Sequence, residues 1–379
     1  MSDSRLKGLS ALGQSVWYDY IRRDLYTGPL LRRLIDEDGL SGMTSNPTIF
    51  QKAIADTALY DADIRRLGGS GRDPAQVFEA LAVDDVRHAA DAFRPVHDAT
   101  GGNDGFVSIE VGPHLAHDTD GTIAEARRLW QACSRPNVMI KIPGTRAGIP
   151  AIHQCLADGI NINITLLFAI DRYRDVMEAY LSALERRAAA RAPVDRIRSV
   201  ASFFVSRVDT NADKRLDAVA ADAARPAADR DLARSLRGRL AIANARLAYE
   251  AFEQVVGSPR FQTLRAQGVA TQRPLWASTS AKDPAYPDLY YVEALVAPDS
   301  VDTMPPETYE AYKDHGDPRV RIHDDLDRAH STFDGLRRLG IDVLQITGEL
   351  EDEGVKKFAE SYDALLKAVA VKMKAVGVA

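Results

Sequence analysis

Lys141 lies in the apolar segment 138–143, a setting that normally excludes a solvated ammonium group. Lysine is scarce in this chain, since only 11 of the 48 basic residues are Lys. Burial lowers the pKa of an amine, and a neutral amine can attack a carbonyl carbon to form a Schiff base, which a guanidinium cannot do. The segment therefore indicates a Schiff-base nucleophile, with a structural lysine paired to a carboxylate as the alternative.

Two carboxylates stand in similar apolar runs and could supply acid–base steps. Asp19 ends the run 16–19, and Glu110 has apolar neighbours in 107–111, where strand alternation would turn its side chain inward. A Schiff-base enzyme must expel water from the carbinolamine and must move a proton on the substrate hydroxyl. Asp19 and Glu110 are the candidates for these steps, and capping of the following helix is the alternative for each.

Arg207 and Lys282 follow two later apolar runs and have small hydroxylated neighbours. A cation with hydroxyl neighbours can bind a phosphate through charge-assisted hydrogen bonds, so both positions suggest a phosphate site. A solvated charge at a strand end is the alternative for each. The other polar side chains at comparable positions are Thr44, Ser45, Asn46, Asn163, Thr165, Ser202, Ser278 and Ser280.

The elements that would position these residues alternate along the chain. Short apolar runs, rich in β-branched and aromatic residues, are each followed by polar residues, Gly or Pro and then by a helical pattern. Eight such units favour a closed (β/α)8 TIM barrel over an open doubly wound sheet, and a barrel collects its reactive groups at the carboxyl ends of the strands. The predicted strands are 15–18, 40–44, 106–111, 138–143, 160–168, 199–206, 274–279 and 300–304.

Additional helices are expected between barrel units and at the C-terminus. Two helical insertions are predicted, near 56–97 and 211–267, and amphipathic helices are expected over 122–133, 170–190 and 232–256. The chain after residue 304 also has a helical pattern, ending with 350–375. We find no linker that would divide the chain, so residues 1–379 are interpreted as a single barrel domain with insertions.

Composition excludes several classes of protein. The 379 residues are 45% hydrophobic and 27% charged, typical of a globular protein with a sizeable core. The net charge of −6 argues against nucleic acid as a partner. No window is long and apolar enough for a membrane span, and no targeting segment is recognised at the start, so a soluble, cytoplasmic protein without a membrane partner is expected.

Cofactors and metals are not expected. No predicted strand is followed by GxGxxG, so a nicotinamide cofactor is not indicated. Cys133 and Cys155 are far apart and are interpreted as reduced structural thiols. His114 and His117 have HxxH spacing, but no acidic ligand motif accompanies them, so a metal site is not predicted.

Several segments resemble the transaldolase family in order and spacing. They are 42–50 (GMTSNPTIF), 107–111 (VSIEV), 139–143 (MIKIP) and 161–168 (NINITLLF). Segments 199–209, 272–282 and 302–305 are similar to the longer bacterial branch of that family, and the resemblance covers about residues 14–316. It implies a (β/α)8 barrel with the Schiff-base lysine on its fourth strand, where the strand count places Lys141.

The resemblance also implies functions for the other residues. Asp19 would be the acid–base residue at the hydroxyl of the breaking bond, and Glu110 would act through a water held with Thr165. Hydroxyls of the bound dihydroxyacetone unit would meet the side chains of Asn46, Asn163 and Ser202, while Arg207 would take the phosphate. The implied reaction moves dihydroxyacetone from sedoheptulose 7-phosphate to glyceraldehyde 3-phosphate, giving erythrose 4-phosphate and fructose 6-phosphate, without metal or organic cofactor.

The sequence departs from the family pattern at two places. Shorter members have an Arg two residues after the serine of the seventh strand, whereas Ser278 is followed here by Thr279 and Ser280. Lys282 is therefore our candidate for the second phosphate-binding cation. Gly112 and His114 also replace the more usual Asp and Arg after the glutamate.

Two other functions are compatible with a barrel of this kind. One is a Schiff-base aldolase that releases free dihydroxyacetone, and the other is a catalytically silent sugar-phosphate binder. Binding alone gives no reason to bury the amine of Lys141, whereas Phe204, a ring without a hydroxyl, favours transfer, because free aldolases of this kind tend to have a tyrosine at the matching position. The oligomeric state is left open by the sequence.

Overall fold

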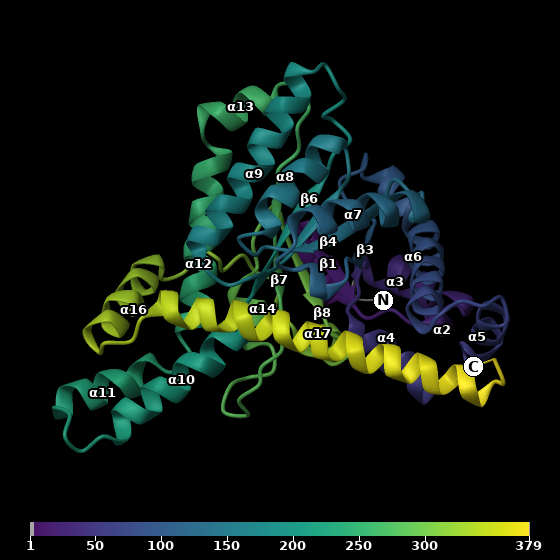
Figure 1. Cartoon of the computed structure of the whole chain (residues 1–379). Coiled ribbons are helices and arrows are strands. Elements are labelled where there is room, and N and C mark those ends of the chain that lie inside the picture. The colour runs from purple at the N-terminus through teal and green to yellow at the C-terminus, as the bar shows by residue number, and fades with distance from the viewer. Residues whose placement is uncertain (1–3, 379) are drawn as a thin grey trace.

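Eight parallel strands form a closed barrel in the computed structural model, which describes residues 4–378. Each strand pairs with the next, and the last strand pairs with the first (Figure 1). All eight predicted strands are confirmed, with small shifts at their ends. The strands are β1 (Gln14–Asp19), β2 (Gly42–Thr44), β3 (Phe106–Glu110), β4 (Val138–Pro143), β5 (Ile162–Leu167), β6 (Ser199–Phe204), β7 (Arg273–Ala277) and β8 (Ser300–Met304).

The register brings the carboxyl ends of the strands to one end of the barrel. Glu110 pairs with Lys141 across β3 and β4, and Lys141 pairs with Asn163 across β4 and β5. Asp19 pairs with Thr44 across β1 and β2. Residues from separate parts of the chain are therefore placed around one opening, as the barrel fold requires of an active site.

Gly42 explains how the shortest strand, β2, fits against β1. A Cβ atom at residue 42 would lie 2.4 Å from the indole ring of Trp17, so a side chain cannot be accommodated there. Trp17 is fully buried and its backbone pairs with Gly42. The absence of a side chain thus lets β2 close the barrel beside a large aromatic residue.

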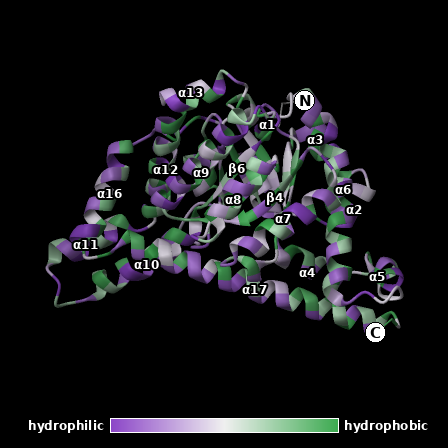
Figure 2. Ribbon diagram, turned by 45° about the horizontal axis from the view of Figure 1, so that its top comes forward, coloured by the Kyte–Doolittle hydropathy of each residue, from purple (hydrophilic) through white to green (hydrophobic). Residues whose placement is uncertain are grey.

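Helices surround the barrel, with short ones before β1 and between β1 and β2. Hydrophobic and hydrophilic residues are mixed along the outer helices in Figure 2, as expected of helices that bury one face and expose the other. The helices that precede β6 are α1 (Arg5–Ala11), α2 (Arg23–Thr27), α3 (Leu30–Asp38), α4 (Pro47–Asp56), α5 (Asp61–Gly68), α6 (Pro74–Ala99), α7 (Thr119–Cys133), α8 (Gly148–Asp158) and α9 (Ile170–Ala189). A 3-10 turn, Pro113–Leu115, follows β3.

The longest helical interval separates β6 from β7. It holds α10 (Ser206–Ala221), α11 (Ala227–Leu236), α12 (Leu240–Val256) and α13 (Pro259–Arg265), and after β7 come α14 (Tyr290–Ala294), α15 (Pro306–His315), α16 (Leu326–Arg338) and α17 (Val343–Ala375). Helices α10 and α11 extend to one side of the barrel in Figure 1.

The helix expected over 232–256 is interrupted, so this prediction was wrong in its continuity. Helix α11 ends at Leu236 and α12 begins at Leu240. Gly238, between them, has φ 69°, and its amide donates to Asp213 Oδ1 at 2.9 Å. Arg237 leaves the helical conformation with ψ 137°, and the left-handed Gly238 after it, held by a carboxylate from α10, turns the chain although the apolar pattern continues.

The C-terminal helix is also longer than expected, because it begins at Val343 and not at residue 350. Asp342 caps it by accepting a hydrogen bond from the Leu344 amide at 2.9 Å. Helix α17 crosses the mouth of the barrel beside α4 (Figure 1). A helix distant in sequence therefore becomes part of the wall around the carboxyl ends of the strands.

Candidate active site

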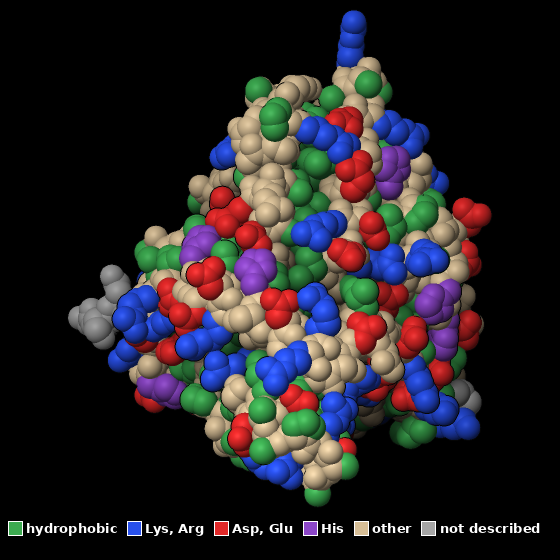
Figure 3. Space-filling view, turned by 90° about the vertical axis from the view of Figure 1, so that its left-hand side faces the viewer, with side chains coloured by type: hydrophobic (Ala, Val, Ile, Leu, Met, Phe, Trp, Pro, Cys, Tyr) green, Lys and Arg blue, Asp and Glu red, His purple; other side chains and the backbone are tan. Residues whose placement is uncertain are grey.

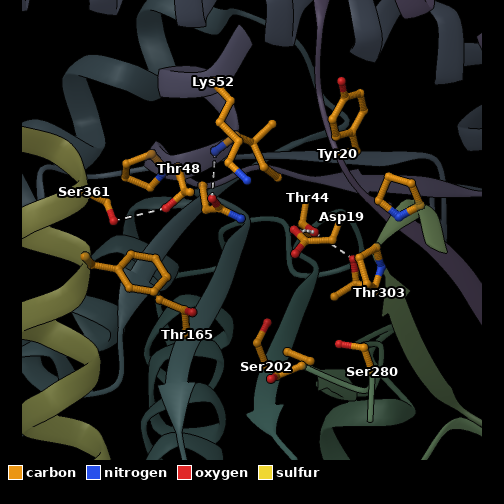
Figure 4. A pocket seen from close by; sticks show the side chains of 18 of the residues that line it. Asp19, Tyr20, Thr44, Thr48, Lys52, Thr165, Ser202, Ser280, Thr303 and Ser361 are labelled. Atoms are coloured by element: carbon orange, nitrogen blue, oxygen red, sulfur yellow. Dashed lines mark hydrogen bonds between the residues drawn. The ribbon is translucent and has the colours of Figure 1, made fainter. Parts of the chain in front are cut away.

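A cavity of about 610 Å³ opens at the carboxyl ends of the strands. Lys141 and Thr165 lie among its lining residues, and Asp19 and Ser202 face the same space in Figure 4. Most of the predicted site residues line it, namely Asp19, Thr44, Asn46, Lys141, Thr165, Ser202, Phe204, Arg207, Ser278, Ser280 and Lys282. These predicted residues come from six of the eight strand ends, and Thr303 of β8 adds a seventh.

The Lys141 amine is buried and has few partners. Its Nζ donates to the backbone oxygen of Ser45 at 3.3 Å and lies 3.7 Å from Glu110 Oε2. The ring centroid of Phe358, from α17, is 5.7 Å from the same nitrogen. Only 7% of the side chain is exposed, so the amine is held in an enclosed position where it can face a substrate carbonyl without a solvent shell.

Asp19 is held by Thr44, whose hydroxyl is in turn hydrogen-bonded to Thr303. Thr44 Oγ1 donates to Asp19 Oδ1 at 2.7 Å and lies 2.7 Å from the hydroxyl of Thr303 (Figure 4). Burial raises the pKa of the Asp19 carboxyl, while the charge of Lys141 and the Thr44 hydrogen bond oppose that rise. A carboxyl with a raised pKa can release and accept a proton closer to neutral pH, as acid–base catalysis requires.

Glu110 lies behind Lys141 and does not line the main cavity. Burial raises the pKa of its carboxyl to about 7, against the opposing charge of Lys141. Within residues 4–378, Glu110 Oε2 and Thr165 Oγ1 are buried atoms without a hydrogen-bond partner. Buried polar atoms normally find a partner in protein or water, so these two atoms are suited to binding a water molecule.

Asn163 also lies outside the cavity. The Ser202 hydroxyl donates to Asn163 Oδ1 at 2.7 Å, and Asn163 Nδ2 donates to Ser108 Oγ at 3.0 Å. Ser202 itself lines the cavity. The amide of Asn163 therefore orients the Ser202 hydroxyl, and the expected hydrogen bond from Asn163 to a substrate hydroxyl stays a prediction.

Asn46 joins the cavity to α4. Its Oδ1 accepts a hydrogen bond from the Ile49 amide at 3.1 Å and so caps the helix, with Pro47 at the first helical position. The cap fixes the side chain at the rim, and Asn46 remains among the lining residues. The second rim residue of this segment, Thr48, donates its hydroxyl hydrogen to Ser361 Oγ of α17 at 3.1 Å (Figure 4).

Two cations stand near hydroxyl groups at the other side of the cavity. Arg207 lies over the ring of Phe204 at 5.3 Å, and burial lowers the pKa of its guanidinium without removing its charge. Lys282 Nζ donates to Ser280 Oγ at 2.6 Å. Ser278 has φ 57°, a left-handed conformation that turns the chain after β7 so that Ser278 and Ser280 both face the cavity.

Several lining residues were not predicted from the sequence. Thr48 and Thr303 belong to segments that the analysis had singled out, so their proximity to the motif residues was a usable signal. Ile49 lies in the same segment as Thr48, whereas the rest are placed at the cavity by the loop after β1 and by α4, α15 and α17. The missed residues include Tyr20, Arg22, Thr48, Ile49, Lys52, Thr303, Glu307, Phe358 and Ser361.

Among residues 4–378 no group of three or more His, Cys, Asp or Glu side chains is arranged to hold a metal ion. His114 instead lies 2.8 Å from Asp363 of α17. Within the same range no helix combines the length and the apolar character needed to cross a bilayer.

A parallel (β/α)8 barrel with an enclosed lysine and two carboxylates at its carboxyl end has the layout of a barrel enzyme. Comparison with known proteins agrees with this class. The profile of the family described as "Transaldolase/Fructose-6-phosphate aldolase" matches residues 16–369. The chain therefore belongs to the transaldolase/fructose-6-phosphate aldolase family.

Curated relatives are similar to this chain over nearly its whole length. A "Transaldolase" from Saccharopolyspora erythraea is 47% identical over 369 residues, covering 97% of both chains. One from Acidothermus cellulolyticus is 49% identical over 365 residues, covering 96% of this chain and 95% of its own. A "Transaldolase 2" from Nostoc punctiforme is 43% identical over 384 residues and covers 99% of both.

Proposed function

We propose that this protein is a transaldolase that transfers a dihydroxyacetone unit between sugar phosphates through a Schiff base on Lys141. The observation that carries the proposal is the enclosed Lys141 amine, which lies in a large cavity with a carboxylate 3.7 Å away and Asp19 on the same rim. The names of the full-length relatives support the same activity.

The first half of the reaction would use Lys141 and Asp19. The amine adds to the C2 carbonyl of the donor ketose, water leaves, and an iminium ion forms. Asp19 then takes the proton of the C4 hydroxyl as the C3–C4 bond breaks, so that the aldose leaves and the electron pair stays on the lysine-bound three-carbon unit. An acceptor aldehyde reverses these steps, and hydrolysis of the imine restores the free amine.

Glu110 would act through a water molecule shared with Thr165. Loss of water from the carbinolamine, and its return in hydrolysis, both need a proton donor and acceptor near Lys141. Glu110, with its pKa of about 7, is partly protonated and partly ionised at neutral pH, so it can serve in both directions. The unpartnered Glu110 Oε2 and Thr165 Oγ1 are the atoms that would hold the water.

The substrate would be oriented by hydroxyl groups at one side and cations at the other. Asn46 and Ser202 would meet hydroxyls of the dihydroxyacetone unit, with Asn163 aligning Ser202 through their 2.7 Å hydrogen bond. Thr44 would align Asp19. Arg207 and Lys282, helped by Ser278 and Ser280, would bind the phosphate, since fixed cations beside hydroxyls suit a phosphate dianion.

This activity would place the chain in sugar-phosphate metabolism. The donor and acceptor pair would be sedoheptulose 7-phosphate and glyceraldehyde 3-phosphate, giving erythrose 4-phosphate and fructose 6-phosphate, as in the pentose phosphate pathway. The cytoplasm, where such metabolites are found, would be the location. Residues 1–379 would act as one barrel domain, with the helices near 56–97 and 211–267 as insertions.

Reductive trapping tests the mechanism directly. Borohydride reduction in the presence of fructose 6-phosphate, followed by peptide mass mapping, is expected to label Lys141. Lys52 and Lys282 line the same cavity, so the map must distinguish three lysines. Label on either of the others, or no label, would contradict the proposed mechanism. Lys141→Arg is expected to fold and to form no adduct, because guanidinium stays protonated.

A second assay separates a transaldolase from an aldolase that releases dihydroxyacetone. With fructose 6-phosphate alone, little free dihydroxyacetone is expected, and adding erythrose 4-phosphate should give sedoheptulose 7-phosphate. The Phe204 ring, which lines the cavity, cannot protonate the waiting carbanion. Phe204→Tyr adds a hydroxyl and is expected to increase release. Release from the unmodified protein at a rate comparable to transfer would favour the aldolase.

A further inference from the structure

A second cavity, of about 390 Å³, lies outside the barrel between the α11–α12 corner, α14 and α16. It shares no lining residue with the cavity at the barrel mouth. Four arginines line it together with a single acidic residue, and α11, α12 and α16 lie on the face turned to the viewer in Figure 3. The charged lining residues are Arg237, Arg239, Arg246, Arg328 and Asp325.

Two of the four arginines lack carboxylate partners. The side chain of Arg239 is half-buried, yet it makes no ion pair or hydrogen bond with the part of the chain that the structure describes. Arg246 Nη2 donates to the backbone oxygen of Arg321 at 3.0 Å, and its Nε is buried without a partner among residues 4–378. Guanidinium groups normally satisfy their donors in pairs with carboxylates or phosphates, so these two have unused capacity.

The remaining charges do not neutralise the cavity. Asp325 pairs with Arg328 at 3.3 Å, and Arg237 pairs with Asp217 and Asp283, both at 3.1 Å. Burial lowers the pKa of Arg246, and the charge of Arg328 acts in the same direction, whereas Asp324 and Asp325 oppose it. A bound anion would relieve the repulsion among these guanidinium groups.

We propose that this cavity, which we call the α12–α16 pocket, is a binding site for a small phosphorylated molecule, separate from the active site. Guanidinium groups bind phosphate oxygens in paired hydrogen bonds, and four of them converge here on a concave surface. The volume suits a molecule of sugar-phosphate size. The net charge of −6 of the whole chain makes a polyanion such as RNA a poor competitor for the site.

Arg239 gives the sharpest test, because its side chain has no protein partner to lose. Inorganic pyrophosphate, the probe, is titrated into the full-length protein at low ionic strength by calorimetry. Arg239→Gln is expected to weaken one class of binding site at least tenfold. Arg196→Gln, the matched control, removes the same charge from an exposed residue that lines none of the cavities described above, and it should leave the titration unchanged.

Two further variants make the outcome decisive. Arg246→Gln should weaken the same class of site, with equal thermal unfolding midpoints showing that the loss is not due to misfolding. Arg207→Ala should affect only pyrophosphate bound in the main cavity. If Arg239→Gln and Arg196→Gln give the same titration, the α12–α16 pocket is not an anion site. Neither result changes the Lys141 trapping experiment, so the proposed function is tested independently.

Discussion

The chemistry of the site depends on how few partners its central lysine has. Lys141 Nζ has one backbone acceptor and one carboxylate at 3.7 Å, a distance beyond that of a strong hydrogen bond. A bidentate partner would hold the amine in its charged form and block its attack. Glu110, whose carboxyl has its pKa raised to about 7 by burial, stands near the amine without forming such a bidentate pair.

The pKa of Glu110 predicts the acid side of the pH profile. An acid with a pKa of about 7 is protonated below that pH and ionised above it, so a step that needs the carboxylate loses rate as the pH falls. We expect kcat/KM to decline below about pH 7. In Glu110→Gln this acid-side decline should disappear, and kcat should fall by ~10²–10⁴-fold. Steady-state rates between pH 5 and 9 measure it. A limb that persists in Glu110→Gln would assign it to Asp19.

We expect the Arg207 guanidinium to contribute mainly to the affinity for phosphorylated substrates. Losing a charge-assisted hydrogen bond costs about 1.5–3 kcal/mol, so Arg207→Ala is expected to raise KM for phosphorylated donors roughly 10- to 150-fold with a smaller change in kcat. Lys282→Ala should show the same pattern more weakly. Initial rates over a range of fructose 6-phosphate measure both variants. Unchanged saturation curves for Arg207→Ala would place the phosphate elsewhere.

At the level of elements, β7 and β8 share a buried carboxylate that the proposed reaction does not use. Asp302 of β8 is fully buried, and Thr279 Oγ1 donates to its Oδ1 at 3.0 Å. Thr279 stands between Ser278 and Ser280, so this hydrogen bond ties the turn after β7 to β8. Burial raises the pKa of Asp302 to about 8.

The raised pKa of Asp302 should therefore make the free energy of unfolding depend on pH. Its pKa is near 4 in the unfolded chain and about 8 in the folded one, so the carboxyl stabilises the fold below about pH 4 and loses that contribution as the pH rises through 8. Asp302→Asn should gain free energy of unfolding relative to the unmodified protein between pH 5 and 9, by the order of a few kcal/mol. Urea unfolding at several pH values measures it. If the two proteins differed by the same free energy of unfolding at every pH, the raised pKa of Asp302 would be contradicted.

Local pattern predicted most of these elements, because an apolar run followed by polar residues, Gly or Pro recurs along the chain. Lys141, Glu110 and Asp19 could be found in this way. The position of Asn163 beneath Ser202 could not, since it depends on how side chains of two adjacent strands share the barrel interior. The break at Gly238 depends on Asp213, a contact between helices that no local pattern contains. Phe358 and Ser361 reach the cavity only through the docking of α17.

For the whole molecule, α17 closes one side of the mouth. Phe358 and Ser361 line the cavity, and Thr48 joins α4 to α17 by a hydrogen bond. We expect Phe358→Ala to admit water and to raise the ratio of free dihydroxyacetone to transferred product several-fold. Phe333→Ala, on α16 and likewise half-buried, is the matched control. Product analysis by chromatography measures the ratio. Equal ratios in both variants would show that α17 does not exclude water from the reaction.

The position of α17 at the end of the chain has a consequence for how the enzyme is made and lost. Every proposed reactive group precedes residue 305, so a chain still being synthesised has its nucleophile and both acids before it has the wall that encloses them. A molecule clipped by a protease before Val343 is in the same condition. Such chains would cleave the donor sugar and release the aldose, but water would protonate the lysine-bound three-carbon unit, and hydrolysis of the imine would then give free dihydroxyacetone without transfer. The yield of transferred product would therefore depend on the integrity of the last helix, although every proposed reactive group belongs to the barrel.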